Sequence, residues 1–189
     1  LSLGIWEGHK SFAYRGWDTV FQDAALGLDI DTNKQWQSNE GSVPMPLNSL
    51  GKPAAINTYT RFAYAAVGTR LIAQYPMGYG SINRSFEGLQ SLAQITHQHD
   101  RQVHSGWIDF GLAFGVPGLV LIFSCMLSTI YFGLKSKSPM SLPWVIVCLA
   151  FIPFGLIAEI SYKQYFEATI FFLTLASTVI IFSTEKKRI

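Results

Sequence analysis

Charged residues are scarce in this chain and unevenly placed. Asp, Glu, Lys and Arg make up 14% of its 189 residues, about half the share usual in soluble domains. Three stretches contain none of them: residues 111–134, 142–158 and 168–184. Crossing the hydrocarbon core of a bilayer takes about 20 apolar residues of helix, so we expect three transmembrane helices. The rest of the chain is too small to enclose three such helices as the core of a soluble protein.

Other absences narrow the range of possible functions. No block of like charges suggests a nucleic-acid partner. No phosphate loop, dinucleotide fingerprint or nucleophile triad is recognisable. Cys125 and Cys148 both lie in charge-free stretches, and we expect them to pack there rather than to form a disulfide. The sequence begins at Leu1 without a signal-peptide pattern, and we expect it to be a piece of a larger polytopic membrane protein.

Basic residues in short loops indicate the orientation of membrane helices, because they favour the cytoplasmic side. The loop after the first charge-free stretch and the C-terminal tail together carry five, whereas the loop between the second and third carries only Lys163. We therefore expect residues 1–106 in the periplasm, three membrane helices within 107–184, and a basic cytoplasmic tail at 185–189. The five residues are Lys135, Lys137, Lys186, Lys187 and Arg188.

The sequence of residues 1–106, the expected periplasmic region, predicts short helices joined by loops. The predicted fold class is therefore an all-α membrane protein. Apolar residues recur at helical spacing within residues 6–28 and most clearly within 58–75. Residues 29–57 are rich in Asn, Ser, Gly and Pro and predict a long irregular loop. Pro76 ends the second helix, Gly78 and Gly80 favour a turn, and residues 82–95 predict a further short helix.

Several residues that could take part in binding or catalysis lie just before the first charge-free stretch. Ser105 is a candidate N-cap, and His104 precedes the helix N-terminus, where free N–H groups favour an anion. Trp107 is placed like an aromatic residue at a membrane interface. Pro117 predicts a kink inside the helix.

Two motifs in this region resemble those of the O-antigen ligase and polymerase family, which includes protein O-oligosaccharyltransferases. The stretch "HSGWIDFGLAFGVPG" is similar to the family's HN-x-x-L signature followed by a helix with two glycines, with His104 at the histidine and Gly115 and Gly118 at the glycines. Two positions depart from the pattern, since Ser105 replaces an asparagine and Ala113 a frequent glutamate.

The second motif lies upstream. The stretch "RFAYAAVGTRLIAQYPMGYG" is similar to the family's R-x-x-x-W and NP-x-x-G-x-G segment. Arg61 stands at the arginine, Tyr64 or Ala65 near the tryptophan, and Pro76, Gly78 and Gly80 at the proline and glycines. The resemblance covers about residues 58–125 and points to the C-terminal part of such a protein.

The resemblance implies an activity and its partners. Members transfer a glycan from an undecaprenyl-pyrophosphate carrier to an acceptor hydroxyl on lipid A-core, on another carrier-linked glycan or on a protein. Ligation to lipid A-core is the favoured expectation, in the bacterial inner membrane and without a cofactor or metal. The alternatives are an O-antigen polymerase, a protein (pilin) O-oligosaccharyltransferase, or a non-catalytic scaffold or transporter part.

The same resemblance implies roles for particular residues. Arg61 is expected to bind the pyrophosphate, because arginine stays charged and binds phosphate bidentately. Arg70 and Arg101 are candidate further contacts, and Arg84 is a weaker one. His104 is expected either to take the proton of the acceptor hydroxyl or, protonated, to hold phosphate. Asp109 would orient His104 or simply occupy the first turn of the helix, where acids are favoured.

Several residues carry a weaker signal. His97, His99 and Asp100 have a spacing that metal ligands can adopt, but the pattern is too common to favour a metal site. Glu159 and Lys163 either touch the carrier phosphate or only bound the helices, and the second interpretation is favoured. Four aromatic residues could stack on sugars but are favoured as core or interface anchors: Trp17, Trp36, Tyr79 and Trp107.

Overall fold

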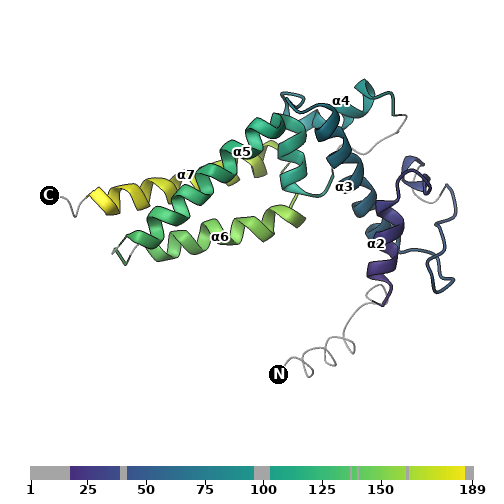
Figure 1. Ribbon diagram of the computed structural model, residues 1–189, viewed down its shortest axis with the longest axis horizontal. Coiled ribbons are helices and arrows are strands. Elements are labelled where there is room, and N and C mark those ends of the chain that lie inside the picture. The colour runs from purple at the N-terminus through teal and green to yellow at the C-terminus, as the bar shows by residue number, and fades with distance from the viewer. Residues whose placement is uncertain are drawn as a thin grey trace. The chain divides into compact units, whose positions relative to one another are not determined.

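The computed structural model describes residues 18–38, 42–95, 103–136, 138–139, 141–160 and 162–185 (Figure 1). All regular structure in these ranges is helical, as predicted, apart from one isolated bridge between Leu47 and Pro53. The chain forms two compact units, Leu1–Ala66 and Val67–Ile189, so the boundary falls inside a helix. The helices are α2 (Val20–Leu28), η1 (Gln35–Gln37), α3 (Ile56–Gln74), η2 (Ile82–Arg84), α4 (Ser85–Leu92), α5 (Gly106–Lys135), α6 (Ser141–Ile157) and α7 (Lys163–Glu185).

In the first unit, a buried carboxylate organises the irregular loop. Asp23 of α2 accepts hydrogen bonds from the Thr19 hydroxyl (2.7 Å), the Asn48 amide (3.0 Å) and the Ala55 backbone N–H (3.1 Å). Burial alone would raise the pKa of Asp23, but these hydrogen bonds outweigh it and hold the pKa below its ordinary value. The charged side chain therefore connects α2 to two points of the predicted loop at residues 29–57, Asn48 and Ala55.

Aromatic side chains fill the rest of this unit. Trp36 is buried and donates its indole N–H to the Ile30 carbonyl (3.3 Å), while the Tyr59 hydroxyl donates to the Asn33 carbonyl (2.8 Å). Trp36 is thus a core residue, as favoured from the sequence. The described parts of the predicted loop are ordered by these bonds, although they contain little regular structure.

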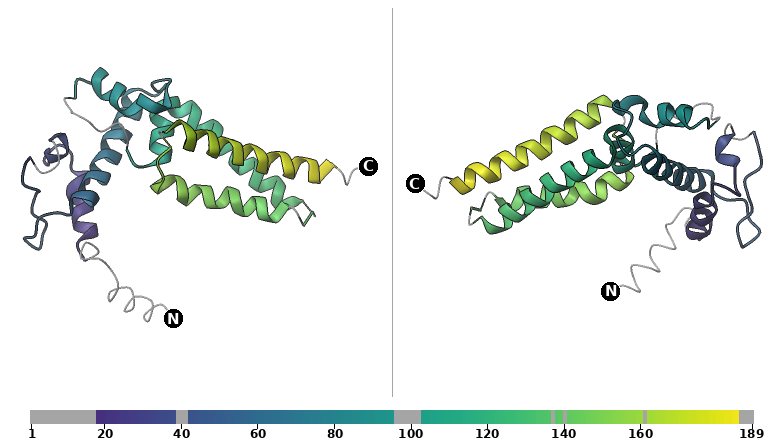
Figure 2. Two further views of the ribbon diagram at one scale, coloured as in Figure 1. Left: turned by 180° about the vertical axis from the view of Figure 1, so that it is seen from behind. Right: turned by 45° about the horizontal axis from the view of Figure 1, so that its top comes forward.

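In the second unit, α5, α6 and α7 lie side by side as a bundle (Figures 1 and 2). Their shared core consists of Met126, Cys148, Leu173 and Ala176. The Thr129 hydroxyl of α5 meets the Ser177 hydroxyl of α7 at 2.8 Å, a polar contact between apolar helices. Cys125 and Cys148 are both free. Cys148 is buried in this core, as expected, whereas Cys125 is exposed, so the packing role expected for Cys125 is not seen.

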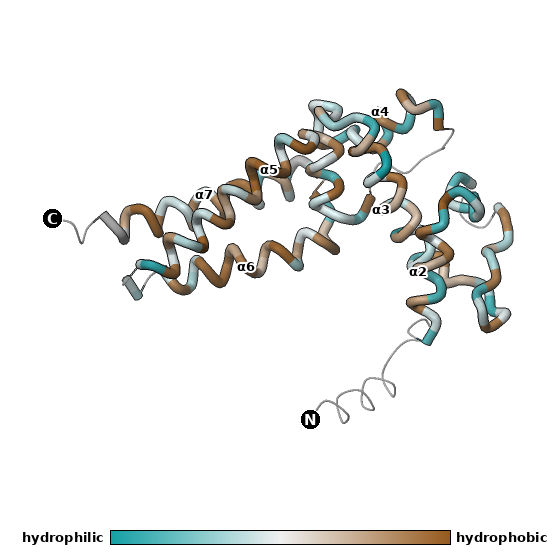
Figure 3. The backbone as a smooth tube through the Cα atoms, in the orientation of Figure 1, coloured by the Kyte–Doolittle hydropathy of each residue, from teal (hydrophilic) through white to brown (hydrophobic). Residues whose placement is uncertain are grey.

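Two helices of this bundle are long and apolar enough to cross a membrane, Gly106–Lys135 and Gln164–Phe182 (Figure 3). Only 33% and 17% of their most apolar windows are buried, whereas the core helix of a soluble protein would be covered. By length and composition, these two helices are long and apolar enough to be membrane spans. The third predicted span corresponds to α6, an apolar helix of 17 residues, which is at the lower limit of the length that spans a bilayer.

Candidate functional site

Helix α5 is broken near its start. Gly115 adopts φ 68° and ψ −168°, which interrupts the helix between Gly106 and Lys135. The predicted kink is present, but it is centred on Gly115, two residues before Pro117. Proline has no N–H, so the Ala113 carbonyl four residues earlier loses its helical partner. The break therefore leaves backbone groups of α5 in need of other partners.

The turn after α3 supplies these partners. The N–H of Tyr79 donates to the Leu112 carbonyl (2.8 Å), and the N–H of Gly80 donates to the Ala113 carbonyl (2.7 Å). In the opposite direction, the N–H of Val116 donates to the Pro76 carbonyl (2.8 Å). A broken helix is tolerated at membrane depth only where neighbouring protein satisfies its backbone in this way.

Glycine is required on both sides of this contact. Gly78 and Gly115 both have positive φ, 77° and 68°. A Cβ on Gly78 would lie 2.5 Å from the Gly115 nitrogen, and a Cβ on Gly115 would collide with the Pro76 carbonyl oxygen. The two segments that carry the sequence motifs are thus in direct backbone contact, and this contact requires glycine at positions 78 and 115.

His104 lies at the start of the same helix and is paired with a carboxylate. Its Nδ1 contacts Oε1 of Glu159, which follows α6. The side chains are 32% and 26% exposed, so the pair lies at the surface of the bundle end and not in its core. A histidine held through Nδ1 retains Nε2 for a second partner, an arrangement typical of general bases.

Asp109 fixes the backbone just before this histidine. Its side chain is 1% exposed, and Oδ1 accepts a long hydrogen bond of 3.4 Å from the Val103 N–H. His104 itself has φ 60°, which is uncommon for a residue other than glycine. The contact of Asp109 is therefore with the segment that precedes His104, and the expected orienting role of Asp109 remains a prediction.

The cap of α5 differs from the expectation. Ser105 occupies the N-cap position, but its side chain makes no capping hydrogen bond. The N–H of Asp109 donates to the Ser105 backbone carbonyl (2.8 Å), which begins the helical ladder. The prediction was therefore right about the helix start and wrong about the bond that the serine side chain would make.

The candidate arginines are distributed over both units. Arg61 is exposed on the part of α3 in the first unit, and Arg70 is exposed on the part in the second unit. Arg84 is exposed at the end of η2, which packs against α5 and α7. Arg101 lies outside the described residues. The pyrophosphate-binding roles expected for these arginines stay predictions.

The metal interpretation falls on residues outside the described ranges, since His97, His99 and Asp100 are among those not described. Within the part of the chain that the structure describes, no group of three or more His, Cys, Asp or Glu residues could hold a metal ion.

The predicted aromatic anchors are accounted for in part. The Trp107 indole N–H donates to the Ile152 carbonyl of α6 (2.9 Å), and its ring packs on Phe123 (centroids 4.7 Å apart). Trp107 thus joins α5 to α6. Tyr79 is 41% exposed, and its ring occupies the space beside Gly88 of α4. Trp17 lies outside the described residues.

Glu159 is the residue of the site that sequence reasoning missed, because it was favoured as a residue that only bounds the helices. It lies 55 positions from His104, so no local pattern connects the two. A signal was nevertheless present, since the predicted topology places the 159–167 turn on the same side of the membrane as His104. An acid at the end of an apolar stretch there is a natural partner for the histidine.

Comparison of the chain with protein-family models, with curated proteins and with solved structures gave no match. The site is therefore interpreted from its own residues and geometry.

Proposed function

We propose that this chain carries the acceptor-activating site of a membrane glycosyltransferase that resembles O-antigen ligases. The enzyme would move a glycan from an undecaprenyl-pyrophosphate carrier to an acceptor hydroxyl, with lipid A-core as the favoured acceptor. The observation that carries the proposal is the His104–Glu159 pair at the start of an apolar helix. A proton acceptor at the start of a membrane helix would lie at the membrane surface, where it can reach a substrate that is anchored in the lipid.

The proposed glycan transfer requires a base beside the acceptor hydroxyl. As the acceptor oxygen bonds to the anomeric carbon of the donor sugar, its proton passes to Nε2 of His104. The bond between the anomeric carbon and the pyrophosphate oxygen breaks, and the carrier pyrophosphate leaves with the electron pair. Glu159 holds the Nδ1 proton and stabilises the imidazolium that forms. Such base catalysis contributes about 10²–10⁴-fold in rate.

The leaving group needs cations. Arg61 is the proposed principal contact of the pyrophosphate and Arg70 a further one, because guanidinium groups bind phosphate oxygens bidentately and do not lose their charge. His104 could instead hold phosphate in its protonated form. The Glu159 contact is compatible with both roles, since a carboxylate stabilises an imidazolium in either case.

The proposed orientation places residues 1–106 in the periplasm and the C-terminus in the cytoplasm of a bacterial inner membrane. Support comes from α5, whose continuous part after the break at Gly115, residues 116–135, corresponds to about 30 Å of helix, the thickness of the hydrocarbon core. His104 precedes one end of this helix and Lys135 occupies the other, as expected for a span with its basic end inside. In this proposal α6 is the third membrane helix.

The proposal is tested with His104→Ala and Arg61→Ala in the full-length protein, followed by glycan transfer in cells and by protein abundance. Both variants are expected to abolish transfer at normal abundance. Lys52→Ala, which removes an exposed cation from the first unit, is the matched control and should transfer normally. Normal glycan ligation by both the His104 and Arg61 variants would refute the proposed site.

The products identify the acceptor in a deletion strain. Lipopolysaccharide without long chains indicates a ligase, lipid A-core that carries a single repeat unit indicates a polymerase, and unglycosylated pilin indicates a protein transferase.

A further inference from the structure

The buried carboxylate of Asp109 is bonded to both chain segments that carry the His104–Glu159 pair. Its side chain is 1% exposed. Oδ1 accepts a hydrogen bond from the backbone N–H of Val103, the residue before His104 (3.4 Å). The backbone N–H of Ile160, the residue after Glu159, also hydrogen-bonds this carboxylate. Asp109 is therefore attached to the neighbour of each member of the pair, although the two members lie 55 positions apart in the sequence.

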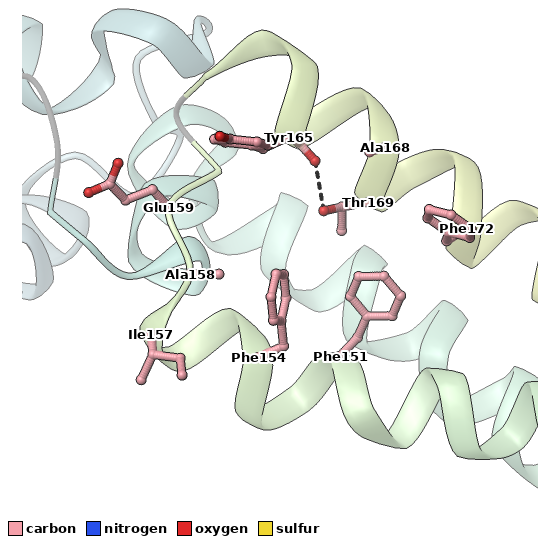
Figure 4. A pocket seen from close by; sticks show the side chains of 9 residues that line it. All are labelled: Phe151, Phe154, Ile157, Ala158, Glu159, Tyr165, Ala168, Thr169 and Phe172. Atoms are coloured by element: carbon pink, nitrogen blue, oxygen red, sulfur yellow. Dashed lines mark hydrogen bonds between the residues drawn. The ribbon is translucent and has the colours of Figure 1, made fainter.

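The connection between α6 and α7 carries Glu159, which follows Ala158 (Figure 4). This connection packs closely on the first turn of α5, because a Cβ on Gly106 would lie 3.0 Å from the Ala158 carbonyl oxygen and 3.1 Å from Cγ2 of Ile160. Asp109 follows Gly106 by about one turn of the same helix. The close approach of the two segments explains why its carboxylate is shielded from water.

A carboxylate in such a place has a free-energy cost. Removing it from water is unfavourable unless hydrogen bonds replace the lost hydration, whereas an apolar side chain of similar size would fill the space without that cost. What a polar side chain adds here is an acceptor for the N–H groups of Val103 and Ile160. Accepting both N–H groups fixes how the two segments lie relative to each other.

The backbone of His104 needs such support. Its φ of 60° is uncommon for a residue other than glycine and persists only where the surrounding structure holds it. Val103 is 1% exposed, and its side chain lies against Gly68 of α3. The residue before His104 is thus held by packing and by Asp109, and the direction of the imidazole follows from the conformation that they maintain.

We infer that Asp109 is a positioning residue, which holds the backbone beside His104 and the backbone beside Glu159 so that the imidazole and the carboxylate meet in the reactive geometry. The inference rests on the proposed function and adds to it a residue that acts without touching the substrate. Asp109 acts through main-chain N–H groups of both segments, while the imidazole itself is paired with Glu159.

Alanine and asparagine at position 109 separate this role from a role of the negative charge. Asp109→Asn keeps a carbonyl oxygen in place of Oδ1 and replaces Oδ2, which has no hydrogen-bond partner in the described part of the chain, by an amide nitrogen. In the full-length enzyme, Asp109→Ala is expected to lower kcat for glycan transfer by about tenfold to a hundredfold, as a small misplacement of catalytic groups does, with the KM for the donor unchanged. Asp109→Asn should restore most of kcat, because it retains the acceptor.

Thr129→Val is the matched control, since it removes a buried polar contact between α5 and α7 elsewhere in the bundle and should leave kcat unchanged. A wild-type kcat in Asp109→Ala would overturn the inference. An equal loss of kcat in Asp109→Ala and Asp109→Asn would assign the effect to the charge and would overturn it as well.

Amide hydrogen exchange tests the two backbone contacts in the full-length protein without any substrate. In Asp109→Ala, the N–H groups of Val103 and Ile160 should exchange about tenfold faster than in the wild type, because both lose their acceptor. Asp109→Asn should keep their protection. The N–H of Ala158, which donates to the Phe154 carbonyl (2.9 Å), is the internal control and should keep its rate. Unchanged exchange at Val103 or at Ile160 would contradict the proposed attachment.

The two proposals fail separately. Normal glycan transfer by His104→Ala would refute the proposed base and leave the exchange result for Asp109→Ala as it stands. Loss of transfer by His104→Ala together with a wild-type kcat in Asp109→Ala would refute the positioning role alone.

Discussion

Gly78 and Gly115 face each other across the break in α5, so closely that a Cβ on Gly78 would lie 2.5 Å from the Gly115 nitrogen. The two residues belong to different sequence motifs, and their contact explains why both motifs contain glycine. Around them, backbone hydrogen bonds join the 76–80 turn to Leu112, Ala113 and Val116. The start of α5, with His104 before it, is thereby attached to the turn.

Gly78→Ala should destabilise the second unit by about 2–4 kcal/mol, because it adds a backbone collision to the ~1–2 kcal/mol cost of a left-handed conformation. Thermal unfolding of the purified full-length protein measures the change. Gly80→Ala is the matched control, since Gly80 also has positive φ (88°) but open space around its Cβ position, and it should cost only ~1–2 kcal/mol. Equal losses in the two variants would show that the close contact contributes nothing.

Glu159→Gln keeps the shape of the side chain but removes its charge. We expect the transfer rate to fall by about tenfold to a hundredfold, which corresponds to the ~1.5–3 kcal/mol typical of a hydrogen bond to a charged group. The KM for the lipid donor should change little, because Glu159 acts through His104 in the proposed reaction. Steady-state kinetics separates the two parameters.

Glu167→Gln is the control for this change, because it removes a charge from an exposed side chain of α7 and should leave the rate unchanged. A wild-type rate for Glu159→Gln would mean that the carboxylate does not position the histidine.

The first unit should lose stability in acid through Asp23. Its pKa is lower in the folded chain than its ordinary value of 3.8, so the unfolded state takes up a proton first as the pH falls. The stabilisation is therefore complete above about pH 5 and is lost as the pH falls through the lower folded-state pKa. Hydrogen exchange of α2 amides, corrected for intrinsic rates, measures this loss.

Asp23→Asn should reduce the protection of α2 at neutral pH and flatten its acid dependence. Asp18→Asn changes an exposed acid just before the same helix and should leave the pH profile as it is. An unchanged profile in Asp23→Asn would assign the acid sensitivity to other groups.

The topology predicts opposite accessibility for the two ends of α5. A single cysteine at position 104, in a variant without Cys125 and Cys148, should react with a membrane-impermeant maleimide added to intact spheroplasts. A single cysteine at position 138, in the loop between α5 and α6, should react only after the membrane is permeabilised. Labelling of position 104 only from the cytoplasmic side would refute both the orientation and the proposed site.

Local patterns predicted most of the helices. The predicted helices at 58–75 and 82–95 correspond to α3 and to η2 with α4, because apolar spacing and the breakers Pro76, Gly78 and Gly80 act within a few residues. The three charge-free stretches correspond to α5, α6 and α7 for the same reason. Details of burial were less predictable: Phe62 is one of the apolar residues that recur at helical spacing within residues 58–75, yet it is 41% exposed.

The parts that escaped prediction depend on contacts between distant segments. Pro117 predicted a kink, but the position of the break is set by the 76–80 turn, which lies more than 30 residues earlier and supplies the missing partners. The pairing of His104 with Glu159 depends on how α5 and α6 pack. Neither relationship leaves a periodic trace in the sequence.

The break has a mechanical consequence. The carbonyls of Leu112 and Ala113 accept hydrogen bonds from the 76–80 turn, and Trp107 ties the same short segment of α5 to Phe123 and to Ile152 of α6. The orientation of this segment, and with it the place of His104, therefore depends on residues far from the imidazole. A substitution in the turn can reach the histidine without altering either member of its pair with Glu159.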